Sequence, residues 1–365
     1  MIMNPLGPWA EDLEKALKLE QLSKNIKPFL DQMEKTFLNE KGFDWQSFQG
    51  AFQQYFQHWM EQQGVSKKTL EDLQQALQIL WKDWFQPRFF QETLFNLARV
   101  YFLQQATESS VDEFGMDPKV VEAVRPLFQF LYKDYWRVSV EGARHLPAKG
   151  RGIIISNHSG MLPYDAAMIH LAAYNEHSAK RHIRFLVEDF VYHFPFLGTF
   201  IHRIGGVRAC PENAAWLLKK NNLVIVFPEG VKGLGKLYED RYQLQRFGRG
   251  GFVRLAIRTK TPIIPCAVIG AEEIHPVLWR SQILAKSMGI PYLPVTPTFP
   301  WLGPLGLIPL PTKWEIIFGK PISFSKYKAK DAEDDLLVHK LAEQVREKIQ
   351  EMVDKSIKKR ASIWF

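Results

Sequence analysis

The chain has 365 residues, 46% of them hydrophobic, which is enough apolar material for two domains or one enlarged domain. Its formal net charge of +8 favours anionic partners such as phosphate groups or anionic lipid. The basic residues form no nucleic-acid reader motif, so we expect no nucleic-acid partner. Only two cysteines occur, Cys210 and Cys266, both in apolar contexts, which excludes a disulfide framework and fits a reducing compartment.

Residues 1–134 are predicted to form an N-terminal helical domain. Five helices are expected in this region. The first covers 13–38, where apolar residues follow helical spacing, and the last begins at Asp117-Pro118, a capping residue followed by proline. Phenylalanines and tryptophans recur on one side of these helices. Two interpretations stay open: a bundle packed on the following domain, or aromatic faces that contact a membrane or an acyl carrier. The N-terminus lacks a basic segment followed by an apolar one, so no signal peptide is expected.

From Tyr135 the pattern changes to short strands that alternate with helices. Apolar runs predict strands at 136–140, 153–155, 183–187, 223–227, 263–269 and 314–318. Helical patterns lie at 166–174, 214–218 and 252–258, and a charged amphipathic helix covers 331–359. This alternation predicts an α/β fold with a mostly parallel central sheet covered by helices. The predicted domains are 135–328 for this α/β part and 329–365 for the C-terminal helix.

Two of the buried strands end in polar, turn-rich loops. His158 follows the 153–155 strand, and Glu229 follows the 223–227 strand. Ligands of open α/β sheets bind at the carboxyl ends of strands, so these side chains are expected at one rim if the strands are neighbours. Histidine can accept a proton at neutral pH, and a carboxylate on its other ring nitrogen would hold the tautomer. Asp165 is placed to be that carboxylate; the alternative role is an N-cap for the following helix, and one side chain can fill both roles.

Lysines, arginines and glycines surround this rim. Arg203 and Arg208 lie in H-R-I-G-G-V-R-A, and Lys232 and Lys236 lie in G-V-K-G-L-G-K. Glycines let backbone approach a ligand closely, and cations beside them suit a phosphate. Neither a P-loop nor a dinucleotide-binding glycine pattern occurs. No G-x-S-x-G elbow is present either, so we expect His158 to activate a hydroxyl of the substrate rather than an enzyme serine.

Four motifs in order resemble those of the glycerolipid acyltransferase superfamily, near the monoacylglycerol and diacylglycerol acyltransferase branch. They are N-H-S-G-M-L-P-Y-D (157–165), G-G-V-R-A-C-P-E-N-A (205–214), F-P-E-G-V-K-G (227–233) and P-I-I-P-C-A-V-I-G-A-E-E (262–273). The resemblance covers about 135–325. The chain departs in two places: the usual His-x4-Asp is His-x6-Asp with Pro163 inside, and the second motif is shorter and lacks the usual Asp before its Arg.

The resemblance implies roles for individual residues. His158 matches the general base, Asp165 its orienting partner, Arg208 the ligand of an acceptor phosphate, and Glu229 an acidic residue that supports acceptor binding. Pro262 to Pro265 matches the structural, acyl-side fourth motif. The full set predicted to bind substrate is Arg203, Arg208, Glu229, Gly230, Lys232 and Lys236.

The implied activity is transfer of a fatty acyl group from acyl-CoA or acyl-carrier protein to a hydroxyl of a glycerolipid or glycerol phosphate. Neither a cofactor nor a metal is expected. Alternatives are an inactive lipid-binding or tethering protein and an acyl thioester hydrolase. Lipid substrates imply a cytoplasmic protein held peripherally on the inner face of an anionic membrane. The charge-free run between Lys286 and Lys313 holds seven prolines, so it cannot span a bilayer as a helix. It either wraps the sheet or contacts the membrane through Phe299, Trp301, Leu302, Leu305, Leu307 and Ile308.

Overall fold

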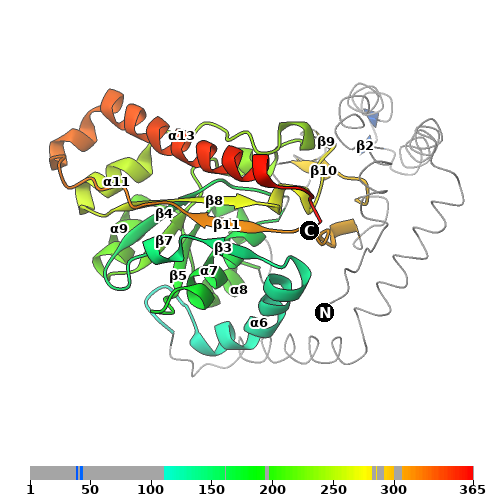
Figure 1. Cartoon of the computed structure of the whole chain (residues 1–365), viewed down its shortest axis with the longest axis horizontal. Coiled ribbons are helices and arrows are strands. Elements are labelled where there is room, and N and C mark those ends of the chain that lie inside the picture. Colours follow the sequence, from blue (N-terminus) through cyan, green and yellow to red (C-terminus); the bar gives the residue numbers. More distant parts are fainter. Residues whose placement is uncertain are drawn as a thin grey trace, which may run out of the picture. The chain divides into compact units, whose positions relative to one another are not determined.

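A computed structural model of the chain describes residues 111–160, 162–193, 197–281, 285, 292–299 and 306–364, with backbone alone at 38–39, 42–43, 190 and 193. The chain divides into two compact units. One comprises 1–96, 237–239 and 276–309, and the other comprises 97–236, 240–275 and 310–365. Each unit is described separately, and Figure 1 labels the elements of both.

The second unit is built on a seven-stranded sheet with the order β3-β11-β8-β4-β7-β5-β6. Every neighbouring pair runs parallel except β11 with β8. This arrangement confirms the predicted α/β fold with a mostly parallel sheet. The strands are β3 Ser139–Glu141, β4 Gly152–Ser156, β5 Ile183–Val187, β6 Gly206–Arg208, β7 Leu223–Val226, β8 Ile263–Ile269 and β11 Glu315–Phe318.

The apolar runs of the central strands are buried on both faces of this sheet. Successive strand residues point to opposite faces, so Ile153 and Ile155 join one core while Ile154 joins the other. Figure 1 shows helices covering both faces. The first core includes residues of α9 Pro211–Lys219, α11 Gly251–Thr259 and α13 Asp335–Lys359, and the second includes residues of α7 Tyr164–Glu176. Because α13 packs against β8, the helix predicted at 331–359 is part of this unit in space.

Three shorter helices complete the unit. The helix α6 is Pro118–Phe130, and the carboxylate of Asp117 accepts the N–H of Lys119, which confirms the predicted start. The helix α8 is Leu197–Arg203 and α10 is Val231–Leu234. Neither these two helices nor β6 was predicted, because each is too short to show a clear hydrophobic period. The C-terminal helix begins later than predicted, since residues Ala329–Glu333 form a separate 3-10 helix.

In the first unit the described elements are two small antiparallel pairs. The strand β9 Trp279–Ser281 pairs with β10 Leu293–Val295, and β1 Leu38–Asn39 pairs with β2 Gly42–Phe43. Leu38, predicted at the end of the first helix, is therefore in a strand. The rest of the predicted helices up to residue 110 lies outside the described residues.

The apolar segment predicted to face a membrane is described only in part. Phe299, Leu307 and Ile308 are half-buried, and Phe299 packs against Ala285 and Leu293 of its own unit. Trp301, Leu302 and Leu305 lie outside the described residues. Within the described part of the chain, no helix combines the length and the apolar character needed to cross a bilayer.

Candidate active site

The candidate site lies where β4 and β7 end. These strands are parallel neighbours, with Ile155 opposite Val226, so the loops that follow them leave the sheet at the same edge. His158 comes two residues after β4 and Glu229 three residues after β7. The backbone N–H of His158 donates to Glu229 Oε1 at 2.9 Å. The predicted common rim therefore exists, and a hydrogen bond joins its two sides.

His158 and Asp165 form a buried pair. Nδ1 of His158 lies 2.7 Å from Asp165 Oδ2, and the Asp165 side chain has no exposed surface. That carboxylate also accepts the N–H groups of Ser159 (3.0 Å) and Ala166 (2.9 Å), so it is held from three sides. Pro163 occupies the N-cap position of α7, so Asp165 lies in the first turn and does not cap the helix. The two additional residues of His-x6-Asp still allow the carboxylate to fold back onto the imidazole.

The orientation of the imidazole is set by this pair and by an aromatic ring. A carboxylate accepts hydrogen bonds, so Nδ1 carries the proton and Nε2 has the free lone pair. Nε2 has no hydrogen-bond partner within the described residues. The ring of Phe227 stacks on the imidazole, with centroids 4.2 Å apart and planes inclined by 20°. The imidazole is thus fixed in position while its basic nitrogen stays available.

Glu229 belongs to a buried charge network behind the imidazole. Its Oε2 accepts the N–H of Gln245 at 2.7 Å and lies 3.3 Å from Lys236 Nζ. The same ammonium donates to Glu272 Oε1 at 2.9 Å. All three charged side chains are at most 4% exposed. Burial opposes the charge of Lys236, but Glu272 and Glu229 outweigh it and raise the pKa of the lysine. Burial raises the pKa of Glu272, and the nearby charge of Glu229 adds to this effect, whereas Lys236 opposes it.

Two of the glycines expected to make room for a ligand make room for protein atoms instead. A Cβ on Gly233, in α10, would lie 2.8 Å from the Cβ atoms of both His158 and Glu229. A Cβ on Gly206, in β6, would lie 2.4 Å from Ile201 Cγ2. At these two positions the glycines allow α10 to pack on the site and α8 to pack on β6.

The predicted substrate-binding cations do not all converge. Arg208 is exposed and forms a two-point ion pair with Asp189, with both N···O distances at 2.7 Å. Arg203 pairs with Asp117 at 3.1 Å, beside the start of α6. Lys236 is buried in the network described above. The structure brings only Lys232 of the four to the surface of a cavity at the rim.

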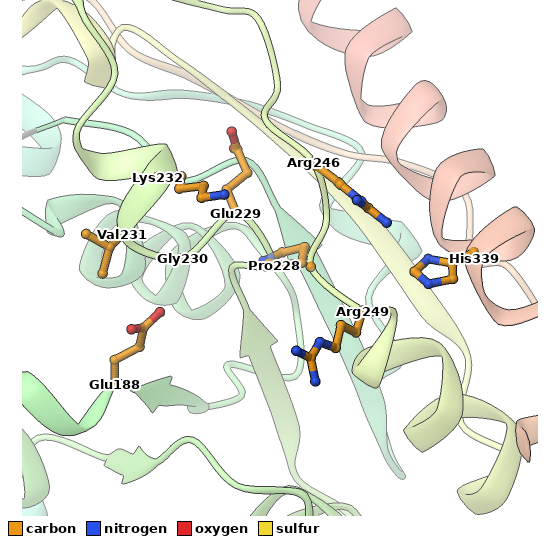
Figure 2. A pocket seen from close by; sticks show the side chains of 10 residues that line it. Glu188, Pro228, Glu229, Gly230, Val231, Lys232, Arg246, Arg249 and His339 are labelled. Atoms are coloured by element: carbon orange, nitrogen blue, oxygen red, sulfur yellow. The ribbon is translucent and has the colours of Figure 1, made fainter. Parts of the chain in front are cut away.

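That cavity has a volume of about 600 Å³, and Glu229 is among its lining residues (Figure 2). Glu229, Gly230 and Lys232, three of the residues predicted to bind substrate, line it, whereas His158 does not. Gly230 has φ +54°, and a Cβ there would lie 2.6 Å from Glu188 Oε1. The remaining lining residues are Glu188, Pro228, Val231, Arg246, Gly248, Arg249 and His339.

Sequence reasoning missed several residues of the site. Glu272 lies in the fourth motif, but nothing in the local sequence indicates that its carboxylate contacts Lys236, 36 positions away. Arg246 and Arg249 lie in Q-R-F-G-R-G-G, a glycine-and-cation pattern of the kind that singled out Lys232. That pattern was a usable signal, whereas His339 sits in an ordinary charged helix. Within the described ranges, no cluster of three or more His, Cys, Asp or Glu residues has an arrangement that could hold a metal ion.

Comparisons with known proteins agree with the motifs. A family model described as acyltransferase matches residues 137–269. An uncharacterized protein of Mycobacterium tuberculosis is 47% identical over 267 residues, which is 72% of this chain and 75% of the relative. A chicken (Gallus gallus) protein named DGAT1/2-independent enzyme synthesizing storage lipids is 30% identical over 146 residues, 40% of this chain and 41% of its own.

Among solved structures, the 1-acyl-sn-glycerophosphate (LPA) acyltransferase PlsC of Thermotoga maritima aligns over 75% of this chain and 98% of its own. The sequence identity is 17% and the TM-score 0.43. The matched range of the family model holds the central strands, and the mycobacterial relative extends the similarity over most of the chain. The chain therefore belongs to the acyltransferase family, within the glycerolipid acyltransferase superfamily that its four motifs resemble.

Proposed function

We propose that this acyltransferase is a glycerolipid O-acyltransferase in which His158 is the general base. The observation that carries the proposal is the 2.7 Å contact between His158 Nδ1 and Asp165, together with an Nε2 that has no partner in the described part of the chain. A base held in one tautomer by a buried carboxylate is suited to take a proton from a hydroxyl. The chicken relative named for storage-lipid synthesis supports a glycerolipid as the source of that hydroxyl.

The reaction requires no covalent enzyme intermediate. Nε2 takes the proton of the acceptor hydroxyl while its oxygen attacks the thioester carbonyl of acyl-CoA or acyl-carrier protein. The tetrahedral intermediate collapses, the thiolate leaves with the proton held by the imidazolium, and an ester remains. Asp165 stabilises the imidazolium between these steps. The oxyanion needs N–H donors. Two glycine N–H groups lie in the loops of the site, those of Gly160 and Gly230. Gly230 N–H already donates to Phe227 O at 3.0 Å, so the N–H of Gly160, two residues after His158, is the better candidate.

Acyl transfer by the purified protein tests the mechanism. His158→Ala should lower the turnover of acyl-CoA with a glycerolipid acceptor by about 10²–10⁴ or more, the usual worth of general-base help. His145→Ala is the matched control, because His145 lies at the other end of the sheet and bonds to Phe318 O at 2.7 Å. A folded His158→Ala protein with normal turnover would overturn the mechanism.

The same assay separates the two alternative functions. A hydrolase that uses the same histidine would release free fatty acid at a rate independent of the acceptor. An inactive binding or tethering module would bind acyl-CoA and form no product with any acceptor. Lipid mass spectrometry of a host that expresses the wild type or His158→Ala identifies the acceptor, including whether it is phosphorylated.

We further propose peripheral attachment to the inner face of an anionic membrane, with the protein otherwise in the cytoplasm. The support is the net charge of +8 and the apolar segment from Phe299 to Ile308. Flotation with anionic vesicles provides the test: wild-type protein should float, and a variant with Leu307→Ser and Ile308→Ser should float less. Wild-type protein that stays in the soluble fraction would contradict attachment.

A further inference from the structure

The cavity beside Glu229 gathers cations from separate parts of the chain. Lys232 belongs to the segment after β7, while Arg246 and Arg249 belong to the loop before α11. His339 contributes a ring from the second turn of α13. Figure 2 shows the side chains of Arg246 and His339 turned toward each other, with Arg249 on the same side of the cavity and Lys232 across from them.

No carboxylate lies within ion-pair distance of these three cations in the described ranges; Arg246 has only a longer-range electrostatic interaction with Glu343, which is itself paired with Arg346. Lys232, Arg246 and Arg249 are exposed, and none forms a hydrogen bond or ion pair through its side chain within the described ranges. Other arginines in the unit do find acidic partners: Arg254 bonds to Asp335, and Arg258 bonds to Glu333 at 2.7 Å. Three cations that line one cavity without a hydrogen-bonded acidic partner repel each other, and a bound anion would relieve that repulsion.

The acidic residues of the cavity do not cancel this charge. In Figure 2 the carboxylate of Glu229 is directed away from Arg246 and Arg249. It accepts the backbone N–H groups of His158 and Gln245 and pairs with Lys236. Glu188 is the single carboxylate left against three cations. The cavity therefore carries a positive excess at the edge of the candidate active site.

We propose that this cavity binds a phosphate ester of a substrate, with Arg246 and Arg249 as the main ligands and Lys232 opposite them. Arginine presents paired N–H donors that match the oxygens of a phosphate, whereas lysine adds a point charge. The volume of about 600 Å³ lies in the range of small-molecule sites, so it holds more of the ligand than the phosphate alone. Glu229 lines this cavity and also accepts the backbone N–H of His158, so one residue connects the cavity to the imidazole.

This inference rests on the proposed function, because the phosphate belongs either to the coenzyme A part of the donor or to a phosphorylated acceptor. Arg208, the residue that the resemblance assigned to acceptor phosphate, is occupied by Asp189 in this structure. The cations at 246 and 249 were not predicted and supply a free alternative in the same unit.

Direct binding measured by calorimetry tests the proposal without turnover. All proteins carry His158→Ala, so no product forms. The probes are two matched pairs: coenzyme A with pantetheine, and monohexanoyl lysophosphatidate with monohexanoylglycerol. The charge-matched control to Arg246→Gln/Arg249→Gln is Arg144→Gln/Lys149→Gln. Those two side chains are exposed and lie before β4, at the end of the sheet opposite His158.

We expect the His158→Ala protein, which keeps Arg246 and Arg249, to bind one phosphorylated probe at least tenfold more tightly than the matching phosphate-free probe. The protein that also carries Arg246→Gln/Arg249→Gln should lose that preference, and the control pair of substitutions should keep it. Loss for coenzyme A assigns the cavity to the donor, and loss for lysophosphatidate assigns it to the acceptor. Equal affinities within both pairs, or a preference that survives the double substitution, would overturn the inference. Failure of the general-base mechanism is distinguishable, because it would appear as normal turnover of the His158→Ala protein.

Discussion

Removal of Lys236 provides a quantitative test of the buried network. In Lys236→Met, the side chains of Glu229 and Glu272 keep at most 4% exposure but lose their shared cation. Loss of one partner of a buried ion pair costs about 3–5 kcal/mol, because the remaining charge is left uncompensated. With a urea m value of about 3 kcal/mol per M, the unfolding midpoint should fall by more than about 1 M.

Urea unfolding followed by near-ultraviolet circular dichroism measures this loss. Lys232→Met is the control: its exposed side chain forms no hydrogen bond or ion pair with the described residues, so the free energy of unfolding should stay within about 0.5 kcal/mol of the wild type. Lys236→Met/Glu272→Gln should be more stable than Lys236→Met, since one uncompensated charge has been removed. If Lys236→Met raised the KM for a substrate and left the midpoint unchanged, the lysine would be a substrate ligand as the sequence predicted, and the argument from the network would be refuted.

Three further predictions concern packing and pH. Gly233→Ala should reduce acyl transfer at least tenfold, because the new Cβ would lie 2.8 Å from the Cβ of His158 and displace that residue. A Gly233→Ala protein with unchanged turnover would contradict this packing. The pKa of Glu272 is raised by burial, so the folded state holds a proton that the unfolded state releases above about pH 4.5. The free energy of unfolding of the wild type, relative to that of Glu272→Gln, should therefore fall as the pH rises from 4.5. If the two proteins gave parallel curves of stability against pH, the titration of Glu272 would not be coupled to folding. Burial and then His182 lower the pKa of His170 from 6.5 to about 4, so acid favours the unfolded state. Between pH 7 and 5 the wild type should lose about 2 kcal/mol relative to His170→Asn in urea unfolding, and an unchanged difference would show that His170 titrates normally.

Local sequence patterns were sufficient for six of the seven strands of the central sheet and for the contact between His158 and Asp165. Runs such as Ile153–Ile155 and Ile263–Ile269 are apolar throughout, and only strands buried on both faces carry that pattern in a helix-covered sheet. The turn residues after the first of these runs predict that His158 leaves the sheet at a carboxyl end. The separation of His158 and Asp165 is seven positions, which is short enough for one loop to bring them together.

Contacts between distant segments could be decided only by the tertiary structure. Glu229 meets His158 across 71 positions because β4 and β7 are neighbours, an order that alternating strands and helices do not specify. The sequence likewise singled out Lys236 as a cation near the rim, but only the structure shows that its ammonium contacts two buried carboxylates, those of Glu229 and Glu272.

Sequence alone thus determined the strands, the order of the motifs and the chemistry of an imidazole backed by a carboxylate, because each depends on residues close together in the chain. The tertiary structure decided which charges are buried as ion pairs and which remain open on a cavity. Arg208 is bound to Asp189, whereas Arg246 and Arg249 are unpaired in the described part of the chain. Charge pairing depends on distance and burial in space, and neither quantity is encoded in the spacing of residues along the chain.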